Sequence, residues 1–139
     1  MYADYEYYKD HFMAVIPEGE FNGYSQRASE ILDYLTRGGL VDNLPSSDTD
    51  LGRVKRACCA VADKIYAVTK RTAELVNNGG TAVKSVSSGG ESMTFELSEM
   101  DLAINGGEKG LMRFYYNVAK VYLSMVGDDH GQLYLYWGI

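Results

Sequence analysis

Two adjacent cysteines, Cys58 and Cys59, are the strongest nucleophiles in this sequence, and only two histidines, His11 and His130, accompany them. A catalytic thiol needs a base to take its proton, and a structural zinc ion needs four ligands at characteristic spacings. Neither pattern is present here. A disulfide between neighbouring cysteines would close a strained ring and hardly constrain the chain. Because both cysteines lie within an apolar helical pattern, we expect buried structural thiols.

The other chemically capable side chains give weaker indications of a site. The run 128–130, Asp-Asp-His, has metal-ligating residue types but lies in a glycine-flanked turn, where charged groups are usually solvated. We interpret Glu30 and Asp33, three apart on a predicted helix, as surface charges and not as an acid–base pair. Phosphate-binding loops and the GxSxG and HExxH motifs are absent from the sequence. We therefore expect no enzymatic activity, no cofactor and no metal site.

Composition and charge are those of an ordinary globular protein. The chain has 139 residues, 46% hydrophobic and 23% charged, with a net charge of −6, and its length suits one domain. An acidic surface repels phosphate backbones, which disfavours general nucleic-acid binding, although Arg53, Lys55 and Arg56 form a local basic cluster. The sequence contains no signal core and no apolar run long enough for a membrane span. We expect a cytoplasmic protein.

Apolar spacing predicts helices over residues 3–12, 18–37, about 50–77 and about 108–125. Asp4 is the expected cap of the first helix, and Asp48 or Thr49 that of the third. The third helix is the expected centre of the fold. Residues 40–50 are predicted to be a loop, and residues 98–110 are predicted to be rich in turns. The apolar row of the central helix is Leu51, Val54, Cys58, Val61, Ile65, Val68, Thr72 and Leu75, and a second face carries Ala57, Cys59, Ala60, Ala62 and Ala67.

Residues 81–97 break this helical pattern. Met93, Phe95 and Leu97 alternate with polar residues, as in a β-strand, and Ser88-Gly89-Gly90 supplies a turn. The predicted hairpin has few apolar residues, so it either packs on its own helices or becomes ordered against a partner. The aromatic tail, 131–139, also needs cover from its own domain or from a neighbour. As assembly contacts we predict Val83, Val86, Met93, Phe95 and Leu97 in the hairpin, and Leu133, Tyr134, Tyr136 and Trp137 in the tail. The fold class is thus mainly α, a small helical bundle with a long central helix and one inserted hairpin.

Several stretches, taken in order, resemble a known family. They are DYEYYKDHFMAVIPEGEFNGYSQRASEILDYLT, RVKRACCAVADKIY, SVSSGGESMTFEL, a helix ending in YLS, and LYLYWGI. Together they resemble the small head–tail connector (adaptor, head completion) proteins of tailed bacteriophages and of prophages of Gram-positive bacteria. The resemblance implies a helical subunit that assembles as a ring between the portal protein and the tail or stopper proteins. DNA would pass through the centre without sequence-specific binding. The implied location is the host cytoplasm during assembly and then the head–tail junction of the virion.

A second interpretation is a small helical protein–protein interaction module or regulator, which would form a stable dimer and not bind a portal. The twelve tyrosines agree with either interpretation, because tyrosine is favoured at interfaces and also covers small cores. The acidic charge suits a DNA conduit but does not distinguish it from an average acidic protein. An enzyme would need a convergent polar pocket, which the sequence does not indicate.

Overall fold

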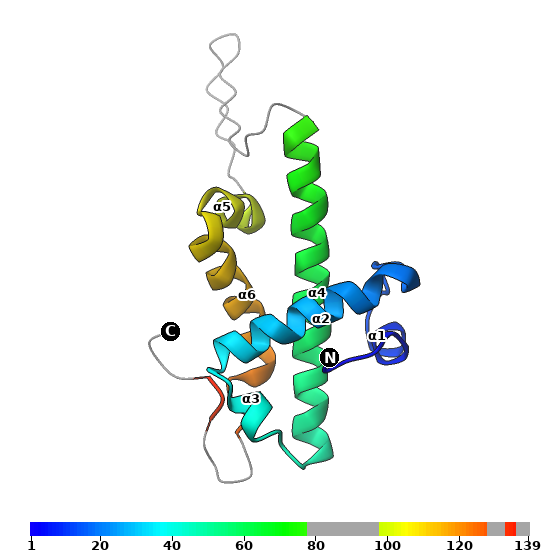
Figure 1. Ribbon diagram of the computed structural model, residues 1–139, viewed down its shortest axis with the longest axis vertical. Coiled ribbons are helices and arrows are strands. Elements are labelled where there is room, and N and C mark those ends of the chain that lie inside the picture. Colours follow the sequence, from blue (N-terminus) through cyan, green and yellow to red (C-terminus); the bar gives the residue numbers. More distant parts are fainter. Residues whose placement is uncertain (78–97, 128–132, 136–139) are drawn as a thin grey trace. The chain divides into compact units, whose positions relative to one another are not determined.

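The computed structural model describes residues 1–77, 98–127 and 133–135 (Figure 1). Within these ranges the chain is mainly helical, which confirms the predicted class, and the one pairing outside the helices is a β-bridge between Gly127 and Leu133. The predicted hairpin, 81–97, lies outside the described residues. The described helices are α1 (Tyr5–His11), α2 (Glu18–Leu35), α3 (Gly39–Asp42), α4 (Asp48–Asn77), α5 (Glu99–Asn105) and α6 (Gly107–Leu123).

The chain divides into two compact units. The first comprises Met1–Tyr66 and Tyr115–Ile139, and the second comprises Ala67–Phe114. Helices α4 and α6 contribute residues to both units.

The long helix α4 carries the predicted apolar row. Val54, Cys58 and Val61 are fully buried, and Ile65, Val68 and Leu75 are nearly so. The small residues of the second face are also buried from Ala57 to Ala62, with Ala67 half-buried. Within the first unit α2 crosses α4 (Figure 1), and their contact is close enough for Ser25 Oγ to lie 3.5 Å from Cys58 Sγ. The core assignment for this helix is therefore confirmed, except that Thr72 is exposed and Leu51 half-buried.

Local signals fix where the helices begin and end. The Asp4 side chain caps α1 as predicted, accepting a hydrogen bond of 2.9 Å from the Tyr7 N–H. Helix α4 begins at Asp48, and the residue before it, Ser47, accepts the first hydrogen bond of the helix through its carbonyl oxygen, from the Leu51 N–H. The predicted cap at Asp48 or Thr49 was therefore placed too late. Helix α2 ends at Leu35, and Arg37 and Gly38 just after it lie in the left-handed region, at φ +55° and +81°. That conformation turns the chain directly into α3.

Two short helices replace segments that the sequence predicts as irregular. Helix α3 begins one residue before the predicted loop 40–50 and occupies its first three residues. Helix α5 lies within the predicted turn-rich segment 98–110. Both are too short to show an apolar period, so periodicity could not find them. Ser98 caps α5 by accepting from the Asp101 N–H at 3.1 Å, and the first turn carries the acidic residues favoured there.

The buried face of α6 agrees only in part with the one that spacing in the sequence predicts, which is Leu111, Phe114, Tyr115, Val118, Tyr122 and Met125. Phe114 and Tyr115 are buried as expected, but Met125, placed on that face by its spacing, is 79% exposed. Ala119 and Leu123 are fully buried instead. The helix ends at Leu123, so Met125 lies in the following turn, where helical spacing no longer determines direction.

In the second unit, α5 and the start of α6 approach so closely that glycine is required. A Cβ added at Gly110 would lie 2.6 Å from the carbonyl oxygen of Ala103. That distance is far inside van der Waals contact, so an alanine at position 110 would push the two helices apart.

Candidate functional site

The N-terminal arm, defined here as residues 1–12, is held on α2 and α4 by hydrogen bonds as well as by apolar packing. The Tyr2 N–H donates to Ser29 Oγ at 3.0 Å, and Ser25 Oγ donates to the Ala3 carbonyl at 2.6 Å. The Tyr2 hydroxyl also donates to the Asp33 carboxylate. Burial and this bond raise the pKa of the Tyr2 phenol. The arm is thus attached through main-chain and side-chain groups together.

Tyr8 is the deepest residue of the arm, with no exposed surface. Its ring stacks on Phe21 of α2, with centroids 4.4 Å apart and planes 18° from parallel. Its hydroxyl donates to Asp63 Oδ1 at 2.6 Å and accepts from the Ile16 N–H at 3.0 Å. One phenol therefore ties together the arm, the entry to α2 and the middle of α4.

Asp63 is a partly buried carboxylate facing that phenol. Burial raises the pKa of Asp63, while the hydrogen bond from Tyr8 and the nearby Lys64 act in the opposite direction. For Tyr8, burial and the bond to Asp63 raise the pKa of the phenol. The geometry is a closed structural pair, since Tyr8 has no exposed surface through which a substrate could reach it.

Cys58 lies in a small polar cluster inside the core. Ser25 Oγ and Ser29 Oγ each lie 3.5 Å from its sulfur, and the Cys58 thiol also donates to the Ser25 carbonyl at 3.7 Å. Cys58 and Cys59 are both free and fully buried. Burial raises the pKa of the Cys59 thiol, which keeps it protonated and unreactive. The prediction of buried structural thiols is confirmed.

Among the described residues no group of histidine, cysteine, aspartate and glutamate is arranged to hold a metal ion. The run 128–130 lies outside them. Glu30 is exposed, as predicted, but Asp33 is half-buried and accepts the Tyr2 hydroxyl, so it is not a simple surface charge. The partnership spans 31 positions in sequence and has no local signal.

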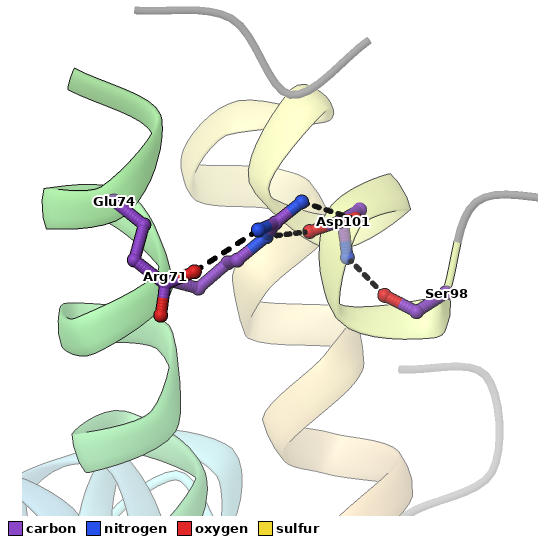
Figure 2. A network of polar contacts seen from close by, with 4 residues as sticks. All are labelled: Arg71, Glu74, Ser98 and Asp101. Carbon is purple, nitrogen blue, oxygen red and sulfur yellow. Dashed lines mark hydrogen bonds and ion pairs between the residues drawn. The ribbon is translucent and has the colours of Figure 1, made fainter. Parts of the chain in front are cut away.

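In the second unit, an ion-pair cluster joins α4 to α5 (Figure 2). Arg71 holds Asp101 through two parallel hydrogen bonds, Nε to Oδ1 at 2.8 Å and Nη2 to Oδ2 at 3.1 Å. Its Nη1 also contacts Glu74 at 3.1 Å. Hydrogen bonds to Asp101, and then to Glu74, raise the pKa of Arg71. We call this arrangement, with the cap of Ser98 on Asp101, the Arg71 clasp; it fixes the start of α5 against α4.

The predicted assembly contacts fall into two groups. Val83, Val86, Met93, Phe95, Leu97, Tyr136 and Trp137 lie outside the described residues. Leu133 is 37% exposed, whereas Tyr134 is 3% exposed and its hydroxyl donates to the Asn43 carbonyl. The Tyr134 N–H donates to the Val126 carbonyl at 3.2 Å, and its ring lies beside Gly39. Tyr134 is thus covered by its own unit, one of the two alternatives expected from the sequence, whereas Leu133 keeps part of its surface exposed.

Sequence reasoning missed a set of exposed apolar side chains in the first unit. Val121 on α6 is 73% exposed and Met125, four residues later, is 79% exposed. Tyr34, at the end of α2, and Val41, on α3, are 69% and 63% exposed. Only an exposure measurement reveals them, because each sits within a pattern that also contains buried residues.

Comparison with known proteins found no matching family model, no matching curated protein and no matching solved structure. The resemblance to connector proteins therefore stays a prediction. In the described part of the chain no helix combines the length and apolar character needed to cross a membrane.

Proposed function

We propose that this chain is a structural subunit of the head–tail connector of a tailed phage or prophage. In this role it forms a ring between the portal protein and the tail or stopper proteins, and DNA passes through the centre. No catalysis and no cofactor are required. The order of the resembling stretches suggested the role, and the mainly helical fold agrees with it.

The observation that carries the proposal is the exposure of large apolar side chains at the C-terminal end of α6. Val121 and Met125 leave most of their surface in water in the isolated chain. Scattered apolar residues are normal on a surface, but here one large apolar side chain in the last turn of α6 and another just after that helix offer apolar area that a partner would bury. Burial on assembly would recover roughly 25 cal/mol for each Å² of that area.

Co-assembly with the portal protein encoded by the same genetic element tests the proposal. Negative-stain electron microscopy should show an added ring of density beneath the portal. The double variant Val121→Ser, Met125→Ser should fold normally and lose that ring, while Leu102→Ser, which changes an exposed apolar residue of the second unit, should keep it. A portal that gains no added density would instead favour the helical interaction module, whatever the oligomeric state of the free chain.

The predicted hairpin remains a second proposed contact. It lies outside the described residues, but the Arg71 clasp joins the two helices from which the segment departs and to which it returns. Deleting residues 85–93 should leave the helical circular dichroism signal largely intact and weaken ring formation. Ring formation at the wild-type level would remove the hairpin from the assembly surface.

A further inference from the structure

The connection between α1 and α2 contains a strained residue. Ala14 has φ +53°, in the left-handed region that disfavours residues with a Cβ. The two neighbours of Ala14 are apolar and exposed: Met13 is 93% exposed and Val15 is 62% exposed. This three-residue hinge, Met13–Val15, therefore combines backbone strain with uncovered apolar surface.

On either side of the hinge the chain is firmly held. Before it, the arm is anchored by Tyr2, Ala3 and Tyr8 on α2 and α4. After it, Ile16 is fully buried and donates its N–H to the Tyr8 hydroxyl. Each of these contacts joins a residue before the hinge to a residue after the hinge in the sequence. The arm is thus a detachable element whose contacts would be identical if it came from another copy.

We propose that the N-terminal arm exchanges between two copies of this chain, with each arm occupying the α2–α4 surface of the other. In the exchanged dimer Ala14 leaves the left-handed region and the hinge becomes extended. Short strained hinges favour such exchange, because the same contacts are kept while the strain is released. The two hinge segments then run side by side and cover Met13 and Val15. This inference does not depend on the connector role, because it concerns the isolated chain.

The geometry limits how the two copies meet. A hinge of three residues spans roughly 10 Å when extended. The two acceptor surfaces must therefore lie close to each other, with the hinges near the two-fold axis. Exchange must first break the hydrogen bonds of Tyr2, Tyr8 and Ser25, so monomer and dimer should interconvert slowly and separate on a column.

Two substitutions at one position give opposite expectations. Ala14→Gly removes the left-handed strain from the monomer and should weaken dimerisation by about fivefold for each hinge. Ala14→Pro fixes φ near −65°, which forbids the observed hinge, and should convert most of the protein to dimer. Size-exclusion chromatography with light scattering, on samples equilibrated at high concentration, measures both. Ala73→Gly, at an exposed position of α4, is the control for a general loss of helix stability.

A spin-label experiment separates exchange from simple association. Spin labels are attached through Glu6→Cys on the arm and Asn22→Cys on α2, both at exposed positions; the native thiols are buried. The reference distance comes from the monomer fraction of the doubly labelled chain, because in an exchanged dimer the two labels of one chain are separated. A dimer formed from the two singly labelled chains should reproduce that reference distance between copies.

A matching distance, with the dimer fraction lowered by Ala14→Gly and raised by Ala14→Pro, would establish the exchange. A dimer whose interchain distance differs from the reference would overturn it, as would a dimer fraction unaffected by Ala14→Gly. Wild-type protein that stays monomeric at millimolar concentration would also overturn it. If Ala14→Pro fails to fold, the comparison of wild type with Ala14→Gly still decides.

Discussion

Removing a single hydroxyl, by Tyr8→Phe, should destabilise the first unit far more than its small change in volume suggests. The ring keeps its stacking on Phe21, 4.4 Å between centroids. What is lost is the donor to Asp63 at 2.6 Å and the acceptor of the Ile16 N–H at 3.0 Å. A hydrogen bond to a charged group contributes about 1.5–3 kcal/mol, and a buried donor left unpaired costs about 1–3 kcal/mol. Because these terms overlap, we expect a loss of about 2–4 kcal/mol.

The loss should depend on pH, and the sign follows from Asp63. Burial raises the pKa of Asp63 in the folded chain, so its contribution to stability is fully present below the unfolded pKa of about 3.9. That contribution is lost as the pH rises through the folded pKa. Tyr8→Phe removes the bond that lowers this pKa, so the pKa rises further. The variant should therefore be most destabilised at neutral pH and less so near pH 4.

Urea unfolding followed by circular dichroism at pH 4 and pH 7 measures both effects. Asp63→Asn is the matched partner, because the amide oxygen still accepts from Tyr8 while the buried charge is gone; it should cost little at pH 7 and remove most of the pH dependence. The double variant closes a mutant cycle, and its coupling measures how much stronger the Tyr8 bond is to a carboxylate than to an amide, about 1 kcal/mol. A loss below about 1 kcal/mol for Tyr8→Phe, or an equal loss at both pH values, would refute this account of the pair.

Three further expectations follow from the same contacts. Ile65→Asp should unfold the domain, because it puts a charge in the core row of α4, and the circular dichroism signal should be lost. Ala73→Asp, on the exposed side of the same helix, should leave the fold intact. A native melting temperature for Ile65→Asp would contradict the core assignment. Above about pH 10 the unfolded chain loses the phenolic proton that Tyr2 retains when folded, so stability should decline as the pH rises further, and Tyr2→Phe should flatten the decline measured by urea unfolding. Arg71→Lys keeps the positive charge but loses the two parallel hydrogen bonds to Asp101. Amide hydrogen exchange in α5 should therefore become faster, with no change in the first unit. An unchanged exchange rate in α5 would show that the Arg71 clasp does not hold this helix.

The sequence predicts α4 well because its stability comes from a repeated apolar row. Val54, Cys58, Val61 and Ile65 recur at alternating spacings of four and three, so the row is recognised even though the predicted start of the helix was two residues late. Ser25 and Ser29 on α2 were missed because a hydropathy pattern counts serine as polar. They nevertheless lie at helical spacing on the face of Phe21, and in the structure they are buried beside Cys58. Their position on the helix indicated that both serines are buried, but their polar residue type concealed this.

Helix α5 was missed although the sequence carried its start signal. Ser98 followed three residues later by Asp101 fits the serine-x-x-acid pattern of a helix N-terminus. The two glycines at positions 106 and 107 favour a turn and obscure that signal. In the structure they end α5 and begin α6, so they separate two helices and do not prevent either. A turn signal fixes a boundary and says little about the segments on each side.

The polar partners of the site could not be predicted in the same way, and the reason is physical. A buried tyrosine needs a partner for its hydroxyl, so the sequence can require a partner for Tyr8 without naming it. Asp63 lies 55 positions away, and nothing in the local spacing of either residue points to the other. Apolar burial decides which face of the arm is covered, because Tyr5 and Tyr8 recur at helical spacing. The Tyr8 hydroxyl then fixes the position of that face along α4, because there its proton has an acceptor in Asp63. The position of the arm is therefore a tertiary property, whichever copy of the chain supplies it.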